Sequence, residues 1–128
     1  MPRVLVVDDN PDVRFTICQI LESRGYDVDL AQNGHEALVL FESRLPDLVI
    51  TDIIMPEQEG LGLIRNILAR RTDARILALS GGGRIGKTDC LKMARGLGAT
   101  AILPKPFEVD ELIDKVDACL SSSRSMTV

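Results

Sequence analysis

Acidic residues, a serine and a lysine follow short apolar runs at four separate places in this chain. Asp8 and Asp9 follow the first run, Asp52 follows the third, and Ser80 and Lys105 stand at the ends of the last two. Carboxylates can bind a divalent cation or attack a phosphoryl group, and a hydroxyl and an ammonium group can hold phosphoryl oxygens. Taken singly, each residue has an ordinary role as a turn former, a helix cap or a solvated charge. Chemistry is expected only if the fold brings them together.

Three carboxylates in one crevice are costly unless a cation accompanies them. At a separation of about 5 Å and an effective dielectric near 20, each pair repels by roughly 3 kcal/mol. Three pairs then approach the stability of a whole domain, on the order of 9 kcal/mol. Mg²⁺ binds carboxylate, water and phosphate oxygens and would offset this repulsion. We therefore expect Mg²⁺ beside Asp8, Asp9 and Asp52, with Lys105 adding positive charge.

The elements that must position these residues follow from the hydrophobic pattern. Apolar runs predict five strands, at residues 4–7, 26–31, 48–51, 75–80 and 100–103. Apolar residues three and four positions apart predict five helices, at residues 10–24, 33–43 and 61–68, then one ending near 97–98 and one at 109–120. Gly60 and Gly62 weaken the start of the third helix.

Strands that alternate with helices predict an α/β fold. The expected architecture is (βα)5, a doubly wound five-stranded parallel sheet with right-handed crossovers and helices on both faces. Ligands of such sheets bind at the carboxyl ends of the strands. All four polar sites follow a strand, so the fold class predicts that they meet at one edge.

Composition sets further bounds. The 128 residues suit one domain, which we expect at 1–121, with a frayed polar tail at 122–128. Fifteen basic and 19 acidic residues give a net charge of −4, which argues against direct binding to nucleic acid. No apolar run approaches the ~20 residues of a membrane span, and no signal peptide is expected. Three scattered cysteines fit reduced thiols in a cytoplasmic protein.

The motifs, taken together, resemble the receiver domain of two-component response regulators. They are Asp8-Asp9, Asp52 with Met55-Pro56, Ser80, and Lys105-Pro106-Phe107. The resemblance covers residues 1–120 and implies a flavodoxin-like, CheY-like sheet with strand order 2-1-3-4-5. It implies a phosphoacceptor signalling domain in a phosphorelay, which catalyses only its own phosphorylation and dephosphorylation.

The resemblance also implies a role for each acidic residue. Asp52 would accept a phosphoryl group from a phosphohistidine on a sensor histidine kinase or a histidine phosphotransferase. Asp9, Asp52 and the backbone carbonyl of Ile54 would bind Mg²⁺ directly, and Asp8 would act mainly through a bound water.

Ser80 would hydrogen-bond a phosphoryl oxygen, and Lys105 would pair with the phosphoryl group. The Lys105-Pro106 peptide bond would be cis. A downstream protein or an output domain would then respond at the surface of the fourth helix, the fifth strand and the fifth helix.

Two features depart from the family pattern. Ile102 stands three residues before Lys105, where the family usually has an aromatic side chain, so an aromatic switch is not expected. A glycine-rich loop begins at Gly81, where the family usually has a shorter loop.

Other functions stay open on the sequence alone. Residues 81–88 satisfy the nucleotide-binding pattern G-x-x-x-x-G-K-[ST] with Gly81, Gly86, Lys87 and Thr88. Only 40 residues follow Thr88, which is little for such an enzyme, but loss of nucleotide binding on Lys87→Ala would favour it. A phosphatase that uses Asp52 as its nucleophile is a further alternative, although the chain lacks the additional segments such enzymes carry.

Overall fold

A computed structural model describes residues 2–53, 59–81 and 95–121 of the chain. In these ranges five strands form one sheet. Their bounds are β1 (Arg3–Val7), β2 (Asp27–Ala31), β3 (Leu48–Asp52), β4 (Ile76–Gly81) and β5 (Ala101–Lys105). The helices are α1 (Pro11–Ser23), α2 (Gly34–Arg44), α3 (Glu59–Arg70) and α5 (Val109–Ser121). The expected fourth helix falls largely outside the described residues, but residues 95–97 are helical.

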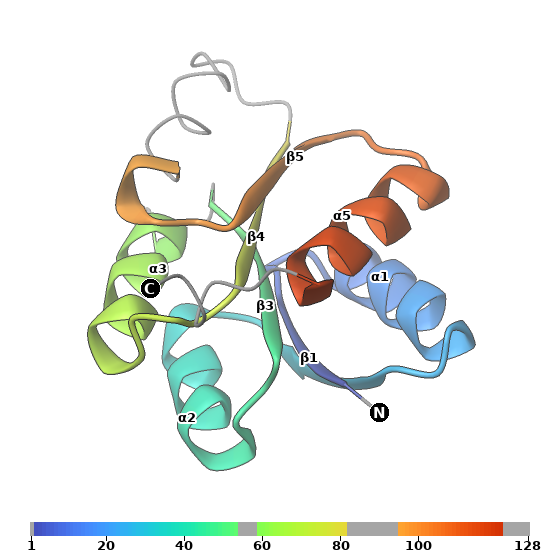
Figure 1. The fold of residues 1–128 in the computed structure, drawn as a ribbon. Helices are drawn as coiled ribbons and strands as arrows, with labels where there is room; N and C mark the ends of the chain where they lie inside the picture. Colours follow the sequence, from blue (N-terminus) through green and yellow to red (C-terminus); the bar gives the residue numbers. More distant parts are fainter. Residues whose placement is uncertain (1, 54–58, 82–94, 122–128) are drawn as a thin grey trace.

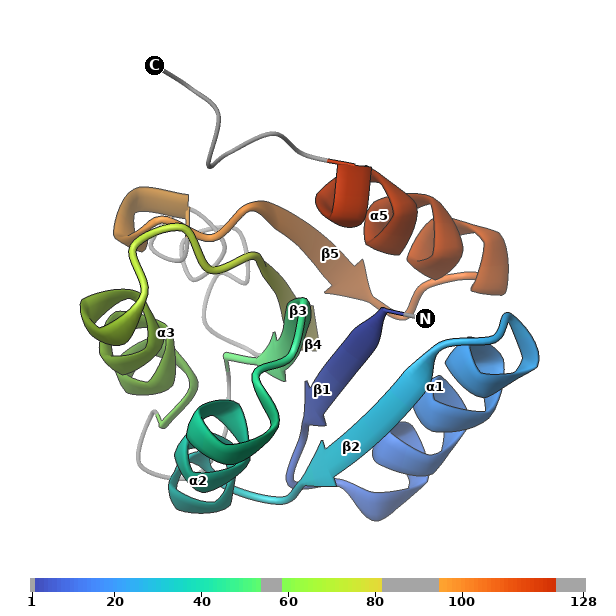
Figure 2. The same cartoon turned by 60° about the horizontal axis from the view of Figure 1, so that its bottom comes forward.

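The sheet is parallel throughout, with strand order β2-β1-β3-β4-β5. Both the parallel α/β architecture and the predicted order are therefore confirmed. Helices α1 and α5 cover one face, and α2 and α3 cover the other (Figures 1 and 2). β1 and β3 are neighbours at the centre, where the chain changes the direction in which it adds strands. Ligands of open α/β sheets bind at such a switch point.

Alternating side chains of the central strands fill two separate cores. Val4 and Val6 of β1 pack into the core beneath α1 and α5. Leu5 and Val7 pack into the core beneath α2 and α3. A continuous apolar run is what a strand needs when both of its faces are covered.

Two asparagines begin the helices that follow β1 and β2. The Asn10 side chain accepts hydrogen bonds from the backbone N–H groups of Asp12 and Val13, and Pro11 occupies the first turn of α1. Asn33 accepts from the N–H of Glu36, as the capping spacing predicts. These caps satisfy N–H groups that have no partner within a helix.

The strand ends differ slightly from the prediction. Tyr26 was expected in the second strand, but its N–H donates to the carbonyl of Leu21 at the end of α1, so β2 begins one residue later. The fifth strand was expected to end before Pro104, yet β5 continues to Lys105. Proline removes a hydrogen bond donor, but β5 is an edge strand, so only one side needs pairing.

The expected glycine loop also starts later than predicted. Gly81 belongs to β4 and pairs with Lys105 of β5, so the strand carries the chain beyond Ser80. At the other predicted boundary, Gly98 follows the helical residues with a φ of 114°, as expected of a glycine that ends a helix. None of the helices in the described ranges has the length and apolar character needed to cross a lipid bilayer.

Candidate functional site

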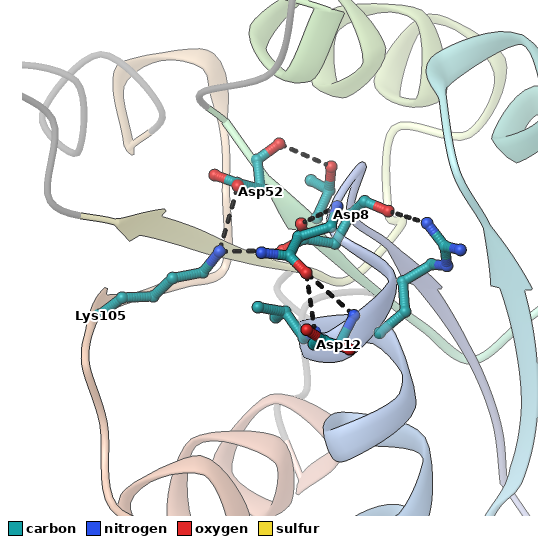
Figure 3. Close-up of polar contacts among 8 residues, drawn as sticks. Asp8, Asp12, Asp52 and Lys105 are labelled. Atoms are coloured by element: carbon teal, nitrogen blue, oxygen red, sulfur yellow. Dashed lines mark hydrogen bonds and ion pairs between the residues drawn. The ribbon is translucent and has the colours of Figure 1, made fainter.

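The carboxyl ends of β1, β3 and β5 bring two carboxylates and an ammonium group into contact. The Nζ atom of Lys105 lies 2.9 Å from Oδ2 of Asp8 and 3.1 Å from Oδ2 of Asp52. Figure 3 shows the lysine side chain extending from β5 toward both acids. The Asp8 side chain is fully buried and that of Asp52 is 8% exposed, whereas Lys105 is 17% exposed. The predicted meeting of these residues is confirmed.

Asp9 completes a group of three carboxylates. One oxygen each of Asp8, Asp9 and Asp52 lie within 4.8 Å of one another. Asp9 is exposed, so its carboxylate faces solvent while the other two are buried. The separation matches the one assumed for the repulsion estimate. Three hard oxygen ligands at this spacing fit a cation such as Mg²⁺, with open positions for water and a substrate oxygen.

Two residues that the sequence analysis missed hold Asp8 in place. The backbone N–H of Asn10 donates to Oδ1 of Asp8 at 2.9 Å, and the Arg14 guanidinium donates to the Asp8 carbonyl oxygen at 2.7 Å. Asn10 carried a signal, because asparagine before proline favours a helix N-cap. No pattern in the sequence pointed to Arg14, which reaches back from the first turns of α1.

The environment of Lys105 favours its charged form. Burial alone would lower the pKa of Lys105, but the hydrogen bond from Nζ to Asp8 and the attraction of Asp52 and Asp8 outweigh it. The net pKa of Lys105 is therefore raised above its usual value. The ammonium group thus remains a fixed positive charge between two buried acids.

Ser80 lies beside the acids and is completely buried. It follows Leu79, the β4 residue that pairs with Asp52. Its Oγ atom has no hydrogen bond partner among the described residues. A buried hydroxyl without a partner is costly in a folded protein, so this atom is available to a ligand at the same strand ends.

An apolar groove adjoins the site. It has a volume of about 480 Å³ and lies between α1 and the segment after β5. It is lined by Asp12, Val13, Thr16, Ile17, Lys105, Pro106 and Phe107. The Lys105-Pro106 peptide bond at its edge is cis, as expected. Phe15, on the same helix, is 59% exposed.

Some predicted features lie outside the described residues. They include Ile54, whose carbonyl was expected to bind Mg²⁺, the Met55-Pro56 turn, Gly86, Lys87 and Thr88 of the nucleotide-binding pattern, and the tail at 122–128. Ile102 is described. It is partly buried and packs against the core beneath α2 and α3, so an aliphatic side chain occupies this position.

The sequence matches the family model of the response regulator receiver domain over residues 4–117. This chain therefore belongs to the response regulator receiver domain family, and it is a receiver domain of two-component signalling.

Similar proteins agree with this membership. The chain is 39% identical over 120 residues to the response regulator MprA of Mycolicibacterium vanbaalenii, covering 92% of this chain and 50% of that protein. It is 35% identical over 126 residues to the transcriptional regulatory protein PdtaR of Mycobacterium tuberculosis, covering 98% and 60%. The chain thus spans about half the length of the curated relatives.

Solved structures show the same fold. A response regulator receiver domain protein from Clostridium thermocellum superposes with a TM-score of 0.89 at 26% identity. The superposition covers 99% of this chain and 100% of that one.

Proposed function

We propose that this receiver domain accepts a phosphoryl group on Asp52 with the help of Mg²⁺ and signals by a change in conformation. The contact of Lys105 with both Asp8 and Asp52 is the observation that carries this proposal. It places the Asp52 carboxylate, whose side chain is 8% exposed, beside a fixed cation. It also keeps two buried acids together at the carboxyl ends of the central strands, which a purely structural protein has no need to maintain.

We assign the Mg²⁺ site to Asp8, Asp9 and Asp52, together with the carbonyl of Ile54 implied by the resemblance. The donor set fits, because carboxylate oxygens of the three acids lie within 4.8 Å of one another. When bound, the ion neutralises negative charge on the acids and on the phosphoryl oxygens. Asp8 is already engaged by Lys105 and Asn10, which supports a role through a bound water rather than direct ligation.

In the transfer step, an oxygen of Asp52 attacks the phosphorus of a phosphohistidine donor. A P–O bond forms as the P–N bond of the donor breaks, and the leaving imidazole takes a proton from solvent. Lys105 balances the charge of the transferred group. The Ser80 hydroxyl donates a hydrogen bond to one of its oxygens, which would supply the partner that this buried atom otherwise lacks. The domain thus catalyses only its own phosphorylation and, by attack of water, dephosphorylation.

The donor is a sensor histidine kinase or a histidine phosphotransferase. We propose that it docks on the groove beside α1, where the partly exposed side chains of Val13 and Phe107 offer an apolar surface next to Lys105. Phe15, also on α1, is a second exposed apolar side chain of this helix. A phosphohistidine presented there would reach Asp52 through the accessible side of the acidic group.

Residues 1–121 form the receiver unit in this proposal. Its signal passes to a downstream protein target or an output domain, with no direct contact to nucleic acid or to a membrane. The reduced thiols of Cys18 and Cys119, together with a donor that acts inside the cell, favour a cytoplasmic setting.

The test uses Mg²⁺ and a small phosphodonor such as acetyl phosphate or phosphoramidate. The intact mass should rise by one phosphoryl group in the wild type and in Asp110→Asn, a control at an exposed position of α5. Asp52→Asn should stay unmodified, and omission of Mg²⁺ should prevent labelling. Labelling that persists in Asp52→Asn would contradict the assignment of the phosphoacceptor.

A further inference from the structure

Gly60 lies in the first turn of α3, directly against the strand end that carries Asp52. A Cβ atom built there would lie 2.8 Å from the carbonyl carbon of Ile53. It would lie closer still to the Cα of Ile53 and to the carbonyl oxygen of Asp52. Ordinary van der Waals contact begins at 3.4 Å, so even an alanine would force the helix and the strand end apart by more than half an ångström.

The backbone conformation of Gly60 gives no other reason for a glycine. Its φ is not positive, unlike those of Gly25 and Gly98, so a side chain would be tolerated conformationally. Glycine also weakens a helix, so helix propensity disfavours it at this position. What the position requires is space. Gly62, two residues further along α3, has no atom within 4 Å of its Cβ position and lacks this requirement.

The peptide group against Gly60 is held from other sides. The N–H of Ile53 donates to the carbonyl of Leu79 on β4 at 2.9 Å. The Thr51 hydroxyl lies 3.0 Å from the Asp52 carbonyl oxygen, which accepts its hydrogen bond. The strand end therefore has little freedom to retreat without losing these bonds.

The helix cannot easily move away either. Leu63, Ile64 and Ile67 of α3 are buried in the core that Ile53 shares. Interiors packed at this density resist displacement, so a shift of the helix would open voids around these side chains. The displacement that a methyl group at position 60 causes is thus transmitted to the peptide group between Asp52 and Ile53.

We propose that Gly60 is a positioning residue for phosphoryl transfer. Because it lacks a side chain, α3 packs against the Asp52–Ile53 peptide group and fixes the Asp52 carboxylate at its distance from Lys105. This inference rests on the proposed function of Asp52, since a positioning role needs a reaction to serve. Displacing a reacting group by about 1 Å lowers a rate by roughly 10²-fold. We expect the smaller displacement here to slow phosphorylation at least roughly tenfold.

The experiment compares Gly60→Ala with the matched control Gly62→Ala in the same helix. The rate of phosphorylation is measured with saturating phosphoramidate and Mg²⁺. Amide resonances of Asp8, Asp52, Ile53 and Lys105 are followed by NMR without any donor. Gly60→Ala should lose at least tenfold in rate and shift these resonances while remaining folded. Gly62→Ala should keep both the rate and the resonances of the wild type.

Each other outcome is decisive. If Gly60→Ala folds but is phosphorylated at the wild-type rate, the inference is overturned. Unchanged resonances around Asp52 would overturn it too, because they would show that only α3 had moved. If the wild type takes no phosphoryl group but Gly60→Ala shifts the resonances and Gly62→Ala does not, the proposed function fails while the positioning stands. If Gly60→Ala does not fold, the double variant with Gly62→Ala, which restores helix propensity, is measured in its place. Failure of both to fold would show a general structural role and overturn the inference.

Discussion

Replacing Lys105 by methionine removes the cation between two acids and keeps most of the side chain's apolar stem. Nζ lies 2.9 Å from Asp8 and 3.1 Å from Asp52, and these carboxylates are 0% and 8% exposed. Removing one partner of a buried ion pair costs about 3–5 kcal/mol, because the other charge is left without compensation. The free energy of unfolding of a whole domain is about 5–15 kcal/mol, so this loss is a large share of it.

The expected change in Tm follows from the size of the domain. For a chain of this length, 1 kcal/mol shifts Tm by roughly 3–5 °C. Lys105→Met should therefore lower Tm by roughly 10–25 °C in the absence of Mg²⁺. Added Mg²⁺ should narrow the difference from the wild type, because the ion supplies positive charge to the same carboxylates and binds only the folded state.

Urea unfolding with and without Mg²⁺ measures the loss of unfolding free energy that underlies the change in Tm, and the part of it that the ion restores. Lys115→Met is the matched control, because Lys115 is exposed on α5 and its loss should change stability by less than about 0.5 kcal/mol. If Lys105→Met unfolds at the same urea concentration as Lys115→Met in metal-free buffer, the ion pairs contribute nothing and the reasoning is wrong. The reasoning is also wrong if Mg²⁺ stabilises Lys105→Met no more than it stabilises the wild type.

Three further predictions concern single groups around the site. Asp9→Asn should raise Tm by a few degrees without Mg²⁺, because it removes repulsion from Asp8 and Asp52, and should weaken Mg²⁺ binding in a titration; a lower Tm would mean that Asp9 is chiefly structural. The raised pKa of Lys105 should stabilise the fold fully below the ordinary lysine value of about 10.4 and stop doing so as the pH rises through the raised value. Urea titrations over that alkaline range should show a decline in the wild type that Lys105→Met lacks. Asn10→Ala should cost about 1 kcal/mol through loss of the α1 cap, measured by thermal unfolding, whereas an unchanged Tm would show that the cap is dispensable.

The sequence predicts the fold well because hydrophobic periodicity and strand topology reinforce each other. The apolar run at β1 indicates a strand that is buried on both faces, and a parallel sheet covered by helices on both sides provides this burial. The polar residues that follow each apolar run then marked where the strands end. The errors were small and local: at β5, proline was taken as a strand stop, although an edge strand tolerates it.

The sequence predicted the charged residues of the site, but it did not predict the residues that hold them in position. Asp8, Asp52 and Lys105 stood out because ionisable residues directly after buried strands are conspicuous. Arg14 and Gly60 did not, because their roles depend on contacts between elements that are distant in sequence. Local propensity marks Gly60 only as a weak point of its helix, since it carries no information on how closely two backbones approach.

The separation of the paired residues along the chain has a consequence for synthesis. Lys105 and Asp8 are 97 residues apart, and Lys105 and Asp52 are 53 apart. As the chain is made from its N-terminus, the acids of β1 and β3 emerge long before the lysine that neutralises them. A nascent chain that lacks Lys105 can form neither ion pair, so the pocket is completed only once nearly the whole domain has left the ribosome.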